Sequence, residues 1–322
     1  MAAEPTSAGK SAWVLVDPRA GTANQALGIA ARLGLPVIEK KLSYGMLAKL
    51  PNFGVSLRSL TTESRAGIAP PWPDLVIAAG RRSAAVARFI KRQSPPTRLV
   101  QVMHPGGSLD AFDLVVIPNH DDPPAQENVM AVTGAPHSLT RAALDAAGKG
   151  WRDRFEGLPR PWIALLVGGA TKRKPFPLSL GARLAREAAR MAEAVGGSLL
   201  VTTSRRTGEA AGAFDGLSPA SSYVYRPDDA GENPYRGILG LADAVIVTGD
   251  SVSMASEAAS SGVPLWIFSP PGFAIPKHEA LHRELYERGV AKPFSGSWET
   301  WSPPPLDEAR RIAERVRAML ED

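Results

Sequence analysis

The sequence of 322 residues contains no cysteine. It therefore has no disulfide framework, no cysteine-ligated metal site and no thiol nucleophile. It also lacks any apolar run near the roughly 18 residues that a membrane-spanning helix needs, and its first residues lack the apolar core of a secretory signal. These absences predict a cytoplasmic protein, with peripheral contact to the inner face of the membrane as an open alternative.

Two common nucleotide-binding signatures are also missing. The chain has no GxGxxG sequence and no Walker A sequence, which disfavours a nicotinamide dinucleotide site and a P-loop. Its 37 Lys and Arg residues exceed its 32 Asp and Glu residues and give a net charge of +5. That excess fits phosphorylated ligands or an anionic membrane surface, and it fits an ordinary soluble protein equally well.

Short apolar runs alternate with helical segments along the first half, which is typical of a parallel sheet covered by helices. Polar residues follow several of these predicted strands. Asp17 follows the run at residues 13–16, and His104 and His120 follow two later runs. In a parallel α/β sheet such loops share one edge, where ligands bind. Asp17, His104 and His120 are therefore candidates for a catalytic base, although a lone histidine is more often structural.

A glycine- and proline-containing stretch near residues 155–161 predicts the connection between two domains. The apolar run at 162–167 then begins a second β/α region. We expect a first domain at 1–157, a second at 158–304, and a last helix within 305–322.

The most informative stretch runs from Leu241 to Pro270. An apolar strand is followed by a polar turn and by a small-residue helix that Asp250 or Ser251 caps. A helix N-terminus attracts phosphate, and Ser251 and Ser253 add hydroxyl donors. Glu257 lies one turn later, on the face of Ser253 and Met254, where its carboxylate suits ribose hydroxyls. A helix packed on a sheet with a solvated Glu257 is the alternative, and the pattern leaves both open.

Two further loops after predicted strands suit a diphosphate. The first contains Gly168, Gly169 and Thr171, in which glycine allows close backbone approach and threonine supplies a hydroxyl. The second contains Ser204, Arg205 and Arg206, and arginine forks match phosphate oxygens. A solvated loop is the alternative for the first, and a capped surface turn is the alternative for the second.

The segment TGDSVSMASEAASSGVPLWIFSP resembles the donor-nucleotide segment of GT-B glycosyltransferases, in which a glutamate of this helix binds the ribose. The chain as a whole resembles the mitochondrial fission (elongated-mitochondria) family and its bacterial homologues. The matching pieces, in order, are GTANQALG, GAPHSLT, LLVGGATKRKPF, TTSRRT, ENPYRGILGLADAVIVTGDSVSMASEA and GVPLWIF. The resemblance implies an α/β, GT-B-like fold with two Rossmann-like, doubly wound domains facing an interdomain cleft, and a last helix that crosses back to the first domain.

The resemblance also implies a function. We expect a metal-independent glycosyltransferase that takes a sugar from a nucleoside-diphosphate sugar, with no cofactor and no nucleic-acid partner. The first domain would hold the acceptor, for which a lipid-linked or envelope glycan is the expectation. A nucleoside-diphosphate-sugar epimerase and a non-catalytic recruitment protein of mitochondrial fission are the alternatives. Asn233 and Tyr235 would border the base or the diphosphate, so the expected nucleotide-sugar site consists of Gly168, Gly169, Thr171, Ser204, Arg205, Arg206, Asn233, Tyr235, Asp250, Ser251, Ser253, Met254 and Glu257.

Overall fold

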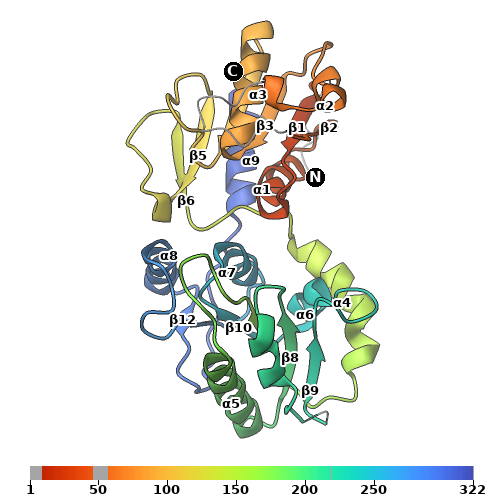
Figure 1. The fold of residues 1–322 in the computed structure, drawn as a ribbon, viewed down its shortest axis with the longest axis vertical. Helices are drawn as coiled ribbons and strands as arrows, with labels where there is room; N and C mark the ends of the chain where they lie inside the picture. The colour runs from red at the N-terminus through yellow and green to blue at the C-terminus, as the bar shows by residue number, and fades with distance from the viewer. Residues whose placement is uncertain (1–8, 46–56, 219, 322) are drawn as a thin grey trace, which may run out of the picture. The chain divides into compact units, whose positions relative to one another are not determined.

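The computed structural model describes residues 9–45, 57–218 and 220–321. The chain divides into two compact units (Figure 1). Unit 1 consists of Met1–Ser138 and Asp307–Asp322, and unit 2 consists of Leu139–Leu306. Among the described residues, every helix is too short or too polar to cross a bilayer.

Unit 1 is built on a six-stranded sheet in which every paired strand is parallel. The strands follow the order β2-β1-β3-β4-β5-β6. The chain therefore reverses its direction of winding between β1 and β3, which is where sheets of this kind bind ligands. The strands are β1 (Ala12–Val16), β2 (Val37–Lys41), β3 (Leu75–Ala79), β4 (Arg98–Val102), β5 (Leu114–Pro118) and β6 (Val129–Val132).

Helices cover both faces of this sheet because side chains alternate along each strand. Ala12 and Val14 of β1 face a core shared with α1 (Ala20–Ala30) and α9 (Glu308–Glu321). Trp13 and Leu15 face the opposite core, which includes α3 (Gly80–Gln93). The last helix, α9, thus packs beside α1 in unit 1 (Figure 1). The unit also contains η3 (Leu57–Ser59), α2 (Thr62–Ala66) and η4 (Asn119–Asp121).

Unit 2 contains a second six-stranded sheet, whose paired strands are also parallel. Its strands follow the order β12-β11-β10-β7-β8-β9, so its reversal lies between β7 and β10. The strands are β7 (Trp162–Val167), β8 (Ser198–Thr203), β9 (Ser222–Tyr225), β10 (Ala244–Thr248), β11 (Leu265–Phe268) and β12 (Lys292–Pro293). The helices are α4 (Arg141–Phe155), α5 (Leu178–Ala194), η5 (Gly208–Phe214), α6 (Tyr235–Leu241), α7 (Val252–Ala259) and α8 (Pro276–Glu287).

The boundary between the units lies about one helix earlier than the sequence predicts. The stretch that predicts a domain connection follows α4, and α4 belongs to unit 2. It packs against α6 at very short range, because a Cβ atom at Gly237 would lie 2.3 Å from the Trp151 ring and one at Gly240 would lie 2.1 Å from the Leu144 carbonyl oxygen. Glycines of both helices allow this contact, since a Cβ atom at Gly148 of α4 would lie 3.2 Å from the Leu241 side chain.

The two parallel, helix-covered sheets confirm the predicted doubly wound α/β, GT-B-like fold. The interdomain cleft stays a prediction.

Candidate functional site

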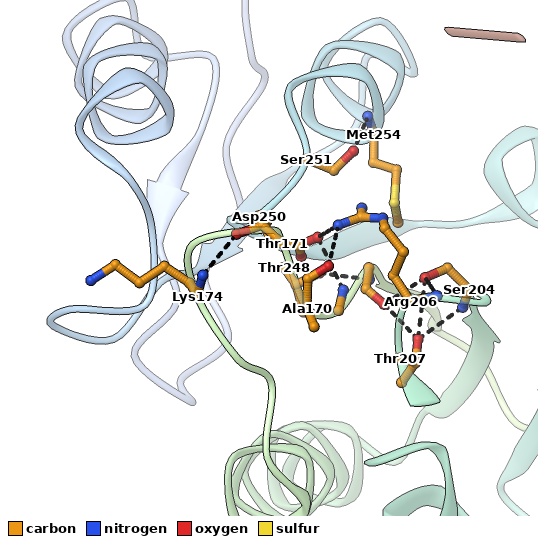
Figure 2. Close-up of polar contacts among 12 residues, drawn as sticks. Ala170, Thr171, Lys174, Ser204, Arg206, Thr207, Thr248, Asp250, Ser251 and Met254 are labelled. Atoms are coloured by element: carbon orange, nitrogen blue, oxygen red, sulfur yellow. Dashed lines mark hydrogen bonds and ion pairs between the residues drawn. The ribbon is translucent and has the colours of Figure 1, made fainter. Parts of the chain in front are cut away.

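The loops predicted to bind a diphosphate lie together at the carboxyl edge of the unit 2 sheet. β7 pairs with β10 on one side and with β8 on the other. The loops that follow these three strands therefore meet at the point where the winding reverses. Figure 2 shows this group, with Arg206 extending from the β8 loop toward Asp250 and with Ser251 and Met254 at the start of α7. The geometry makes this edge the candidate site.

The glycines of the β7 loop admit other parts of the protein. A Cβ atom at Gly168 would lie 2.3 Å from Asp250 Oδ1, and one at Gly169 would lie 2.0 Å from the Arg206 carbonyl oxygen. Their N–H groups are also engaged, since Gly168 donates to Thr248 Oγ1 at 2.7 Å and Gly169 donates to Asp250 Oδ2 at 3.0 Å. The two glycines therefore allow the three loops to pack together, and any ligand contact has to come from other groups.

Asp250 and Arg206 form the central ion pair of the edge. The Asp250 side chain is 1% exposed, and its Oδ2 lies 2.7 Å from Arg206 Nη1. The same Nη1 group lies 3.2 Å from the Ala170 carbonyl oxygen. A guanidinium has five N–H donors in a rigid fork, and both contacts use Nη1. The Arg206 side chain is 42% exposed, and neither contact uses its Nε and Nη2 groups.

The predicted hydroxyl groups mainly hold the loops in place. Ser204 Oγ donates to the Gly168 carbonyl at 2.6 Å and so joins the β8 loop to the β7 loop (Figure 2). Thr171 Oγ1 accepts the Lys174 N–H at 3.1 Å, which closes the loop after β7. Thr207, which the sequence reasoning missed, is buried and accepts the Ser204 N–H at 2.9 Å. Arg205, by contrast, is exposed.

The first turn of α7 faces this edge. Ser251 is the N-cap residue, and its Oγ accepts the Met254 N–H at 3.4 Å, as predicted for one of the two candidate caps. The first N–H groups of any helix have no acceptor within the helix and carry partial positive charge. Ser253 is half-buried in this turn, and Met254 packs partly against the core. The turn thus offers N–H and hydroxyl donors beside Arg206.

Glu257 has a protein partner that the sequence did not reveal. The Tyr235 hydroxyl donates to Glu257 Oε2 at 2.6 Å, which ties α6 to α7. Burial raises the pKa of Glu257, and the hydrogen bond from Tyr235 and the charge of Arg236 act against that rise. Burial also raises the pKa of Tyr235 well above its usual value, so the hydroxyl stays a donor. Asn233 Oδ1 accepts the Tyr235 N–H at 2.9 Å and fixes the start of α6.

Unit 1 has a separate polar cluster at its own reversal point. Asp17 follows β1, is buried, and accepts the Arg19 N–H through Oδ1 at 2.9 Å. The Tyr44 ring lies beneath the Arg82 guanidinium, at 5.4 Å from the ring centroid. Burial raises the pKa of Tyr44, the charge of Asp17 adds to that rise, and Arg82 and Arg19 oppose it. Asp17 therefore lies within a mixed cluster of one carboxylate, two arginines and a phenol.

The other two candidates for a catalytic base lie further along the sheet. His104 follows β4 and His120 follows β5, whereas Asp17 follows β1. Neighbouring strands are about 4.8 Å apart, so β1 is separated from β4 by about 10 Å and from β5 by about 14 Å. His104 is exposed, and its Nδ1 accepts the Gly106 N–H at 3.0 Å. The three side chains come from separate positions along the edge, and the identity of the base stays a prediction.

Two histidines of α8 complete the unit 2 edge and were missed at the sequence level. His282 is buried against the loop after β10, since a Cβ atom at Gly249 would lie 2.5 Å from the His282 ring. Burial lowers the pKa of His282 to about 4. His278 lies one turn earlier on the same face, and the charges of Asp250 and Arg206 act on it. The available sequence signal was that the two histidines lie four residues apart in the segment after β11, which places both on one face of a helix.

Comparison with known sequences identifies a matching family model and similar proteins. A family model described as mitochondrial fission ELM1 matches residues 20–320. The uncharacterized protein RP120 of Rickettsia prowazekii is 30% identical over 96% of this chain and 98% of its own length. The mitochondrial fission protein ELM1 of Arabidopsis thaliana is 32% identical over 77% of this chain and 64% of its own length.

Solved structures share the architecture at low sequence identity. The UDP-GlcNAc 2-epimerase from Neisseria meningitidis, bound to UDP-GlcNAc, aligns with a TM-score of 0.51 at 10% identity over 97% of this chain and 92% of its own. The glycosyltransferase SnogD from Streptomyces nogalater aligns with a TM-score of 0.50 at 16% identity over 97% and 95%. At these identities the similarity extends to the fold, which transferases and epimerases share.

Proposed function

The chain belongs to the mitochondrial fission ELM1 family, and we propose that it binds a nucleoside-diphosphate sugar through unit 2 and transfers the sugar to an acceptor. One observation carries the proposal. Three loops that the sequence marks for diphosphate binding come from adjacent strands, β10, β7 and β8, at the reversal point of the unit 2 sheet. A doubly wound sheet binds ligands at that point.

Each group of the edge has a role in this proposal. The Nε–Nη2 edge of Arg206 and the first turn of α7 contact the diphosphate, where they stabilise the charge that develops on the leaving group. Asp250 holds Arg206 in place, and the glycine loop supports Asp250. Ser253 adds a hydroxyl to the same turn.

Glu257 receives the ribose in this proposal. Because Tyr235 occupies Oε2, the other carboxylate oxygen, Oε1, accepts a ribose hydroxyl. Helix α7 carries both Glu257, which accepts the ribose hydroxyl, and the turn that binds the phosphates, so this helix fixes the distance between the pentose and the phosphates. Unit 1 supplies the acceptor side, where we propose Asp17 as the general base because it is a buried carboxylate that follows β1 at the reversal point of the unit 1 sheet. The proposed acceptor is a lipid-linked or envelope glycan.

A thermal-shift screen with nucleoside diphosphates and their sugars tests the binding step. A ligand at a hundredfold excess over its Kd adds about 2.7 kcal/mol to stability and raises the melting temperature. Glu257→Ala should remove the rise for the best ligand. Glu193→Ala is the matched control, because Glu193 is exposed in the last turn of α5, at the opposite edge of the sheet, and should leave the rise intact. A chain that binds none of these ligands would refute the proposal and favour a recruitment role.

An epimerase is the second candidate, because structures of that class share the fold, including one bound to a nucleotide sugar. Incubation with a nucleotide sugar alone separates the two reactions. A transferase needs an acceptor for productive turnover, whereas an epimerase converts the sugar without one. Formation of an epimeric nucleotide sugar in the absence of any acceptor would overturn the transferase assignment and leave the binding site as described.

A further inference from the structure

His278 is placed at the phosphate-binding edge by its neighbour one turn later. His282 packs against Gly249, the residue that precedes Asp250, and forms a hydrogen bond with the Gly249 backbone. Residues four apart share one face of a helix, so His278 lies on the face of α8 that is turned to this edge. The first turn of α8, which begins at Pro276, therefore joins the loops after β7, β8 and β10.

Asp250 Oδ1 and His278 Nδ1 are among the buried polar atoms that have no hydrogen-bond partner within the part of the chain that the structure describes. Leaving a buried polar atom unpaired destabilises the folded protein, so each atom calls for a partner. Asp250 Oδ1 requires a donor, and a protonated His278 ring offers two donors. Only the protonated ring carries a donor on both nitrogens at once, one for a carboxylate oxygen and one for a ligand oxygen.

We propose that His278 is a phosphate-binding residue of the unit 2 site and that it takes up a proton when a nucleoside diphosphate binds. In the protonated ring, Nδ1–H serves Asp250 Oδ1 and Nε2–H serves a terminal phosphate oxygen. The inference rests on the proposed function, which it deepens. It adds the first turn of α8 to the three loops of the site and predicts a pH dependence that those loops do not require.

The charges around His278 account for the direction of the change. In the free protein, burial lowers the pKa of His278, the cations Lys277 and Arg206 lower it further, and Asp250 acts in the opposite direction. His282, on the same helix, is neutral near pH 7 because its pKa is about 4. An arriving diphosphate brings negative charge that opposes Lys277 and Arg206, so the balance shifts toward the protonated ring. Binding and protonation are therefore coupled.

Isothermal titration calorimetry with UDP tests the coupling, at pH 7.5 in buffers that differ in ionisation enthalpy. The slope of the observed enthalpy against the buffer enthalpy counts the protons taken up. We expect an uptake approaching one proton for the wild-type chain and none for His278→Gln. Wild-type affinity should fall by up to tenfold per pH unit as the pH rises from the pKa of His278 in the free protein to its pKa in the complex. The affinity of His278→Gln should change much less across that pH range.

The outcomes separate the two proposals. Binding of UDP without proton uptake by the wild-type chain would overturn the role of His278 and leave the diphosphate site standing, even if the variant failed to fold. Equal uptake by wild type and His278→Gln would do the same. Glu279→Gln is the matched control, since Glu279 is exposed in the same turn of α8 and its replacement should retain the uptake. If UDP and the other common nucleoside diphosphates all fail to bind, both the site and the role of His278 fall.

Discussion

Acidification should destabilise this protein through His282, and the size of the effect follows from its surroundings. The side chain is buried against the loop after β10, and burial lowers its pKa from 6.5 to about 4. The unfolded chain therefore binds a proton at higher pH than the folded chain does. Stability from the neutral ring is fully present above pH 6.5 and is lost as the pH falls toward 4. At pH 4.5 the loss amounts to about 2.5 kcal/mol, at 1.36 kcal/mol per pKa unit.

The assay is urea denaturation of the wild type and of His282→Gln at pH 7 and at pH 4.5. Glutamine does not titrate in this range, so subtracting the two proteins removes the contribution of the carboxylates. We expect the free-energy difference between them to shift by about 2.5 kcal/mol in favour of the variant at pH 4.5. Tyr286→Phe is the control, because its ring lies 6.5 Å from the His282 ring and the change removes no group that titrates there. A pH-independent difference between wild type and His282→Gln would refute the reasoning.

Three further predictions concern stability. Glu257→Gln should stabilise the free protein at pH 8 and give no gain at acid pH. The raised pKa of Glu257 makes the wild type lose stability as the pH rises through that pKa, whereas glutamine stays neutral. A difference in melting temperature between the two proteins that stays constant with pH would contradict this. Gly169→Ala should destabilise far more than Gly196→Ala in urea titrations. Both have positive φ, which costs roughly 1–2 kcal/mol, but only at Gly169 does a Cβ meet backbone, at 2.0 Å, which adds about 1–3 kcal/mol. A fragment of residues 139–306 should fold cooperatively by circular dichroism, whereas 158–306 should not. The shorter fragment lacks three buried side chains of α4 (Leu144, Trp151 and Phe155), whose burial together stabilises the folded unit by about 6 kcal/mol. Equal melting temperatures of the two fragments would contradict the boundary.

The sequence predicted the strands well because buried parallel strands are short, apolar and β-branched. β7 has the predicted ends, and Ser251 caps α7. The sequence failed where an element depends on a distant partner. The sequence assigns α4 to the first domain until its contact with α6 is seen, and that contact depends on Gly237 and Gly240, more than 80 residues later.

The same limit applies to the candidate site. Residue type indicated which loops are polar, and the sheet order brings those loops together. Residue type did not reveal that Gly168 accommodates Asp250, that Ser204 serves the Gly168 carbonyl, or that Tyr235 binds Glu257. Such pairings join residues far apart in the chain, so local pattern carries no information about them.

The most direct test of the site compares the dissociation constants of UDP and UMP for the wild type, a double variant and a control variant. The double variant, Arg206→Gln with Asp250→Asn, removes the ion pair without leaving a buried charge. The control, Arg190→Gln, removes an exposed arginine in the last two turns of α5, away from the carboxyl edge of the sheet. We predict that the wild type and Arg190→Gln bind UDP at least tenfold more tightly than UMP, and that the double variant loses this preference. Equal affinities of the wild type for UDP and UMP, or a double variant that still prefers UDP, would contradict a diphosphate site at this edge.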